Sequence, residues 1–167
     1  TSFRIGLASL TNAPIFPDNP TFREQIDDFS SLPGIPLRAG LQGKDNSGSD
    51  YGSYIIGFLE APETGNYRFN IASDDNSALF LSTDHLREHR KLIAFELESG
   101  APLFGGARQD QRFSVPIALV RGQKYYFEVL HKQAAGGSYI QVGWERPDGA
   151  QEIIPALHLA QYPLDLF

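Results

Sequence analysis

The sequence contains no cysteine and no methionine among its 167 residues. The absence of cysteine excludes disulfide bonds and thiol chemistry, but it does not place the protein in the cytosol, because many bacterial surface proteins also lack cysteine. The absence of an initiator methionine and of a signal peptide favours a module excised or processed from a larger protein. We expect residues 1–167 to form a single domain, since this length is sufficient to bury a hydrophobic core.

Long apolar runs and clusters of basic residues are absent as well. The sequence has no run of about 18 apolar residues and therefore predicts no membrane insertion. Acidic residues outnumber basic ones by 20 to 14, which gives a net charge of −6 and argues against nucleic acids and anionic membranes as partners. Neutral ligands and divalent cations suit this charge better.

The sequence is rich in residues of short strands and turns, with 12 Phe, 7 Tyr, 16 Gly and 11 Pro. Alternating patterns predict strands at residues 2–10, 51–59, 65–72, 78–81, 92–95, 112–120, 123–132, 138–145 and 151–155. We also expect a helix between Asn19 and Pro33, an extended segment at residues 36–43 and an extended tail at residues 157–167. The expected fold is all-β, a sandwich or barrel of about ten short, mainly antiparallel strands with at most one or two short helices.

Two adjacent aspartates, Asp74 and Asp75, stand between the strand patterns of residues 65–72 and 78–81. One interpretation is an ordinary polar turn, because aspartate in turns hydrogen-bonds to nearby backbone. The other is a site for a hard cation. Calcium takes about 6–8 oxygen ligands, so a second loop must supply what two carboxylates cannot.

A candidate for that second loop is the segment Gln-Ala-Ala-Gly-Gly at residues 133–137, between two further strand patterns. Its two glycines allow positive φ angles and let carbonyl oxygens come close to a ligand. Gln133 adds a neutral side-chain oxygen. The alternative interpretation is a flexible hairpin loop.

Several short segments follow one another in a specific order: FPDNP at residues 16–20, TGNYRF at 64–69, IASDDN at 71–76, LSTD at 81–84, GQKYY at 122–126 and VGW at 142–144. Their order and spacing resemble those of the anthrax protective antigen-type (PA-fourteen) domain family. Lectin members of this family include yeast flocculins and adhesins and bacterial adhesin modules. The resemblance implies a cis peptide bond between Asp74 and Asp75, and calcium bound by both carboxylates.

The resemblance also implies which residues hold the ligands. The implied calcium ligands are Asp74, Asp75, Gln133, Ala135 and Gly137, and the implied sugar contacts are Asp74, Asp75, Gln133, Gly136 and Gly137. Many lectin members have asparagine where this sequence has Gln133. The implied function is calcium-dependent binding of neutral cell-surface sugars such as fucose, glucose or mannose, with calcium directly ligating vicinal hydroxyls, in an extracellular or cell-surface monomeric module.

A second function remains open at this stage, a non-catalytic accessory module of a larger secreted glycosidase or toxin in which calcium only stabilises loops. An enzyme is not expected. Residues 85–89 match H-x-x-E-H, a zinc-protease pattern, but the neighbouring strands leave no room for the long helix that this pattern requires. The motif G-x-S-x-G is absent. Residues 45–50, DNSGSD, resemble the start of an EF-hand, yet Ile56 stands where the loop needs glutamate, which favours a solvated turn.

Overall fold

The computed structural model describes residues 2–20, 23, 51–97, 102–106 and 109–163. The strands are β1 (Tyr51–Glu60), β2 (Gly65–Asp74), β3 (Asn76–Leu81), β4 (Lys91–Glu96), β5 (Ile117–Leu119), β6 (Lys124–Gln133), β7 (Tyr139–Glu145), β8 (Gln151–Ile153) and β9 (Leu159–Gln161). The helices are α1 (Ser2–Thr11), the short α2 (Gln109–Arg112) and two 3₁₀ turns, η1 (Arg87–His89) and η2 (Ala156–His158).

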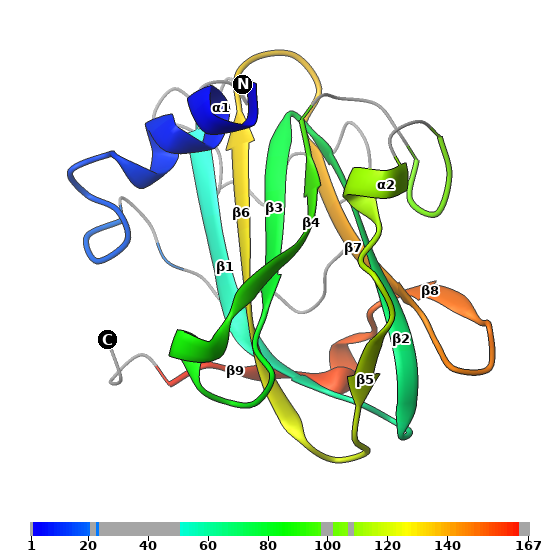
Figure 1. Ribbon diagram of the computed structural model, residues 1–167. Helices are drawn as coiled ribbons and strands as arrows, with labels where there is room; N and C mark the ends of the chain where they lie inside the picture. Colours follow the sequence, from blue (N-terminus) through cyan, green and yellow to red (C-terminus); the bar gives the residue numbers. More distant parts are fainter. Residues whose placement is uncertain (1, 21–22, 24–50, 98–101, 107–108, 164–167) are drawn as a thin grey trace.

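The strands form two sheets that pack face to face (Figure 1). One sheet has the order β4-β3-β6-β1-β9 and the other has the order β5-β2-β7-β8, and the paired strands are antiparallel. This arrangement confirms the predicted all-β sandwich.

Apolar side chains from alternate strand positions fill the space between the sheets. Tyr67, Val129 and Trp144 are completely buried there, and Phe127 is nearly so. Trp144 and Phe127 therefore belong to the core between the sheets. Tyr126 is also completely buried, but it lies on the opposite face of β6, where its hydroxyl donates a hydrogen bond to Glu128.

The prediction of a strand at residues 2–10 is wrong, because this segment forms helix α1. Leu7 and Leu10 are three residues apart, so one helical face carries both. That face packs against Leu130 on the outer surface of the five-stranded sheet. Gly6 lets the helix backbone come close to Asn76, since a side chain at Gly6 would collide with the Asn76 amide. Tertiary packing therefore decides the structure of this segment.

Other predictions near the ends of the chain have mixed outcomes. The predicted helix between Asn19 and Pro33, the extended segment at residues 36–43 and the loop at residues 45–50 lie outside the described residues. The predicted strand at residues 112–120 is shorter, because only Ile117–Leu119 form a strand, β5, while Phe113 makes an isolated antiparallel bridge to Asn70 of β2. The described part of the tail forms η2 and β9, and β9 adds to the edge of the five-stranded sheet beside β1. Within the part of the chain that the structure describes, no helix is long and apolar enough to span a membrane.

Candidate functional site

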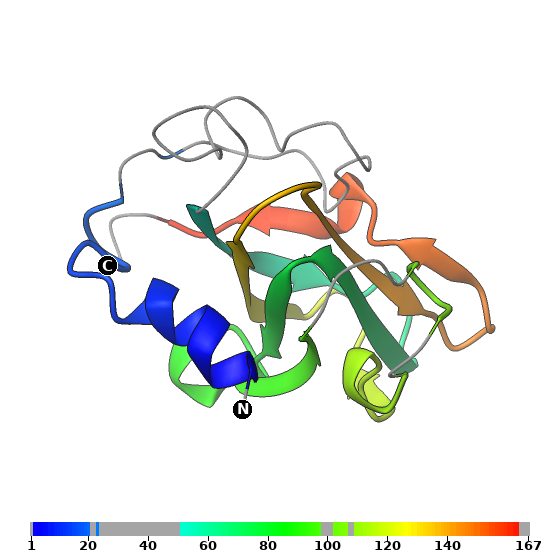
Figure 2. The ribbon, with the colours of Figure 1, turned by 90° about the horizontal axis from the view of Figure 1, so that it is seen from above.

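Two chain crossings between the sheets meet at one end of the sandwich. β2 belongs to the four-stranded sheet and β3 to the five-stranded sheet, so the chain changes sheets at Asp75. The connection from β6 to β7 changes sheets in the same way. Across the strand pairs, Asp74 lies opposite Tyr139, and Asn76 lies opposite Lys132. Figure 2 looks down on this end, with α1 to one side of the two crossings. Neither connection joins two strands of one sheet, so residues 133–137 do not form the hairpin loop of the alternative interpretation.

The two crossings are in direct contact. The backbone N–H of Ala134 donates a 2.7 Å hydrogen bond to Oδ2 of Asp75. Gly137 lies beside Asp74, because a methyl group added to Gly137 would be 3.4 Å from Oδ2 of Asp74. The peptide bond between Asp74 and Asp75 is cis, as the resemblance implies. The structure thus brings the two predicted loops together.

Gln133 ends β6 with its side chain fully buried beneath the second loop. Its Nε2 donates a 2.7 Å hydrogen bond to the carbonyl oxygen of Gly137, which closes the loop on itself. Its Oε1 has no hydrogen-bond partner among the described residues. A buried amide oxygen without a partner is costly, so this atom is suited to a ligand that the protein binds. Ala135 and Gly136 lie exposed at the loop tip, and Gly136 adopts a φ of 88°.

Three buried residues that the sequence analysis did not assign to the site support the aspartates from below. Nε2 of His131 is 2.8 Å from the carbonyl oxygen of Asp74, and Oγ of Ser73 is 2.7 Å from that of Asp75. Oγ of Ser77 is 2.6 Å from Oγ of Ser73. The available signal was the position of His131 on the inward face of β6 after Tyr125, Phe127 and Val129, where a polar side chain needs a partner.

The surroundings of Asp74 disfavour its charged form. Burial, the negative charge of Asp75 and a hydrogen bond to the Asp75 side chain, in that order, raise the pKa of Asp74 to about 6. A bound cation would relieve this repulsion. Below the pair, burial lowers the pKa of His131 to about 4, so its ring is neutral near pH 7.

The donor set fits calcium better than a transition metal. Within the described residues, no three His, Cys, Asp or Glu side chains are grouped so that they could hold a metal ion. A cation at the aspartates therefore needs neutral oxygens from the second loop, and the unpartnered Oε1 of Gln133 is one. Carboxylate, amide and carbonyl oxygens are the ligands of hard cations such as calcium.

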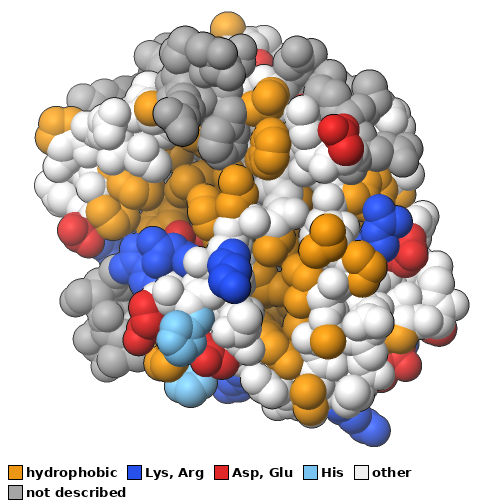
Figure 3. Space-filling model, viewed as in Figure 1, with side chains coloured by type: hydrophobic (Ala, Val, Ile, Leu, Met, Phe, Trp, Pro, Cys, Tyr) orange, Lys and Arg blue, Asp and Glu red, His pale blue; other side chains and the backbone are white. Residues whose placement is uncertain are grey.

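The H-x-x-E-H segment forms no zinc site. Only residues Arg87–His89 are helical, as a single 3₁₀ turn. Nδ1 of His89 is 2.7 Å from Oδ2 of Asp84, and both histidines are exposed. Histidine side chains lie at the surface at the lower left of Figure 3, where Figure 1 places η1. This result agrees with the expectation that residues 85–89 cannot form the long helix that the zinc-protease pattern requires.

The sequence is similar to part of a larger enzyme. It is 35% identical over 119 residues to N-acetyl-beta-glucosaminyl-glycoprotein 4-beta-N-acetylgalactosaminyltransferase 1 of Mus musculus, an alignment that spans 68% of this chain and 12% of the enzyme. The chain therefore corresponds to a small part of that relative.

The fold is shared with solved structures of low sequence identity. An anti-sigma factor domain-containing protein from Clostridium clariflavum superposes with a TM-score of 0.62 at 16% identity, over 89% of this chain and 44% of that one. The Epithelial Adhesin 6 A domain from Candida glabrata, solved in complex with Galb1-3GlcNAc, superposes with a TM-score of 0.52 at 13% identity, over 70% and 54% of the two chains. The sequence model of the PA14 domain matches residues 9–158, most of the chain, and the protein therefore belongs to the PA14 domain family.

Proposed function

We propose that this domain is a calcium-dependent carbohydrate-binding module of an extracellular or cell-surface protein. The observation that supports the proposal most directly is the contact of Asp74 and Asp75 with the β6–β7 loop, above a buried Gln133 whose Oε1 has no hydrogen-bond partner in the described part of the chain. Two carboxylates and a free amide oxygen at one end of a sandwich form the beginning of a calcium shell.

In this proposal the calcium ligands are the carboxylates of Asp74 and Asp75, Oε1 of Gln133 and the main-chain carbonyls of Ala135 and Gly137. When bound, calcium supplies open coordination positions for two vicinal sugar hydroxyls. The chain itself holds these oxygens together, and it leaves the tip of the loop without bulky side chains. Gly136 and Gly137 have no side chains that would keep a sugar ring away from the aspartates.

The similar proteins favour a carbohydrate as the ligand. The adhesin domain from Candida glabrata was solved with a disaccharide that contains galactose. The mouse relative bears the name of an enzyme that modifies glycoprotein sugars. Neutral sugars are therefore the class to test, and galactosides belong in the panel beside the fucose, glucose and mannose that the family resemblance implies. We propose no catalytic role, because the site contains no evident nucleophile.

The second candidate is an accessory module in which calcium only stiffens the two crossings. The observation in its favour is the hydrogen bond from Ala134 to Asp75, which already joins the crossings through the protein's own groups. The two candidates differ in whether calcium recruits a sugar.

A glycan array probed with and without calcium separates the two candidates. We expect binding to neutral glycans that requires calcium, and loss of this binding in Asp75→Asn, because that change removes one charge from the cation shell while its amide oxygen can still accept from Ala134. The matched control is Asp84→Asn, which alters another aspartate in a polar connection, hydrogen-bonded to Leu86 and His89 and away from the crossings. Glycan binding at wild-type strength by Asp75→Asn would contradict the proposed site, and calcium binding without any glycan would favour the accessory module.

A further inference from the structure

Buried donors hold the backbone of the aspartate pair. A carbonyl oxygen can only accept, so His131 must carry its proton on Nε2 and donate it to the carbonyl of Asp74 over 2.8 Å. The hydroxyl of Ser73 donates to the carbonyl of Asp75 over 2.7 Å. Both donor side chains are completely buried. Each main-chain carbonyl of the pair is therefore fixed by one interior group.

The direction of the next hydrogen bond follows from the single proton of a hydroxyl. Ser73 gives its proton to Asp75, so in the 2.6 Å contact between Ser73 and Ser77 the donor is Ser77. The result is a relay from Ser77 through Ser73 to the carbonyl of Asp75. Ser77 also lies directly opposite His131 in the pairing of β3 with β6, so the two donor groups share one buried polar layer.

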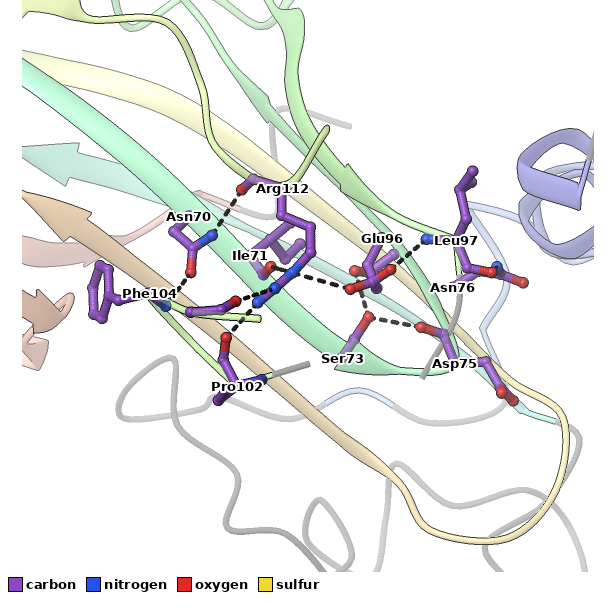
Figure 4. Close-up of polar contacts among 12 residues, drawn as sticks. Asn70, Ile71, Ser73, Asp75, Asn76, Glu96, Leu97, Pro102, Phe104 and Arg112 are labelled. Atoms are coloured by element: carbon purple, nitrogen blue, oxygen red, sulfur yellow. Dashed lines mark hydrogen bonds and ion pairs between the residues drawn. The ribbon is translucent and has the colours of Figure 1, made fainter. Parts of the chain in front are cut away.

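This layer determines where the carboxylates point. Figure 4 shows the carbonyl of Asp75 directed at Ser73 and its carboxylate directed away. On the other side of the pair, the Asp75 carboxylate accepts from Ala134, and Oδ2 of Asp74 lies beside Gly137. A peptide plane that rotated would move the attached side chain, so fixing both carbonyls inward keeps both carboxylates on the side of the second loop.

We propose, on the basis of the calcium site proposed above, that Ser73 and His131 are positioning residues for the cation, with Ser77 orienting Ser73. They touch neither the metal nor the sugar. Their role is to hold the aspartate backbone in the binding arrangement before the cation arrives. Calcium binding then requires no free energy to order this backbone.

A buried serine of the same layer provides the matched control. Ser53 lies opposite His131 in the pairing of β1 with β6, and its side chain is nearly completely buried. Its hydroxyl has no hydrogen-bond partner among the described residues. Ser53→Ala therefore removes a buried hydroxyl at a similar depth without removing a hydrogen bond to the aspartates.

The test is a calorimetric calcium titration of the whole chain, with thermal melting in chelator as a separate measure of stability. We expect Ser73→Ala to raise the calcium Kd by about tenfold or more, the usual effect of removing a group that orients a metal ligand. Ser77→Ala should raise it less, because the Ser73 hydroxyl remains. Ser53→Ala should leave it unchanged.

His131 is tested by a pair of substitutions. His131→Gln keeps an N–H donor near the position of Nε2, whereas His131→Met removes it. We expect the glutamine variant to bind calcium several-fold more tightly than the methionine variant. If Ser73→Ala does not fold, the calcium affinities of Ser77→Ala and of the two His131 variants test the positioning role instead.

Two outcomes are distinguishable. If the wild-type protein binds calcium and Ser73→Ala binds it equally well while melting at a lower temperature, the serine has a purely structural role and the positioning inference is overturned. If the wild-type protein binds no calcium, the proposed function itself fails.

Discussion

The buried ring of His131 makes the stability of the folded domain depend on pH. Its pKa is lowered by burial to about 4, against an ordinary value near 6.5, so the unfolded chain binds a proton more readily than the folded chain between these values. The stability that comes from keeping this ring neutral is fully present above about pH 6.5 and is lost as the pH falls toward 4. The difference corresponds to about 3 kcal/mol.

The His131→Gln variant isolates this effect. Asp74 titrates in the same range with the opposite sign, because its pKa is raised to about 6 and folding favours its protonated form. Asp74 is present in both proteins, so its contribution largely cancels in the comparison. We expect the stability gap between the wild type and His131→Gln to shift by about 3 kcal/mol in favour of the variant between pH 7 and pH 4, measured by urea unfolding in chelator. A gap independent of pH would show that the ring is not buried in its neutral form.

At the scale of elements, a buried ion pair fastens the segment around α2 to both sheets. Nε of Arg112 is 3.0 Å from Oε2 of Glu96 on β4 and 3.1 Å from the carbonyl of Ile71 on β2. Its terminal nitrogens donate to the carbonyls of Pro102 and Gly105, each over 2.6 Å (Figure 4). One side chain therefore joins β2, β4 and the loop that precedes α2.

Removing one member of this pair leaves a buried charge without its partner. We expect Arg112→Leu to lower the free energy of unfolding by about 3–5 kcal/mol. The control is Arg146→Leu. Arg146 forms a partly exposed ion pair with Glu63, and such pairs contribute little to stability, so we expect a clearly smaller loss. Urea unfolding of both variants provides the comparison, and equal losses would contradict the special role of the buried pair.

The sequence predicted the positions of the strands better than the pairing of the strands with one another. Alternation in residues 67–71 identified β2, and the same reasoning located β1, β4, β6 and β7. It could not tell that β2 and β3 lie in different sheets, because alternation gives the faces of a strand and not its neighbour. Ser73 resembled an ordinary turn residue for the same reason, since its partner hydroxyl on β3 becomes visible only when the strands are packed. Helix α1 was missed because its packing on Leu130, more than a hundred residues away, outweighs local preference.

At the scale of the whole molecule, the proposed calcium binding would be linked to folding. A cation that binds only the folded state stabilises it according to its free concentration relative to Kd, by about 2.7 kcal/mol at a hundredfold excess over Kd. For a domain of this size, that stabilisation raises the melting temperature by about 5–10 °C. Magnesium should stabilise less, because it requires a smaller octahedral shell than this pair of loops offers.

The Asp75→Asn variant tells whether this stabilisation arises at the aspartate pair. Asp75 is not part of the apolar core between the sheets, and the asparagine oxygen can still accept from Ala134. We therefore expect its melting temperature in chelator to stay close to that of the wild type, while added calcium produces little further rise. A full calcium shift in Asp75→Asn would place the cation elsewhere. Equal melting of the wild type in calcium and in chelator, measured by calorimetry or circular dichroism, would show that the two crossings meet without holding a metal ion.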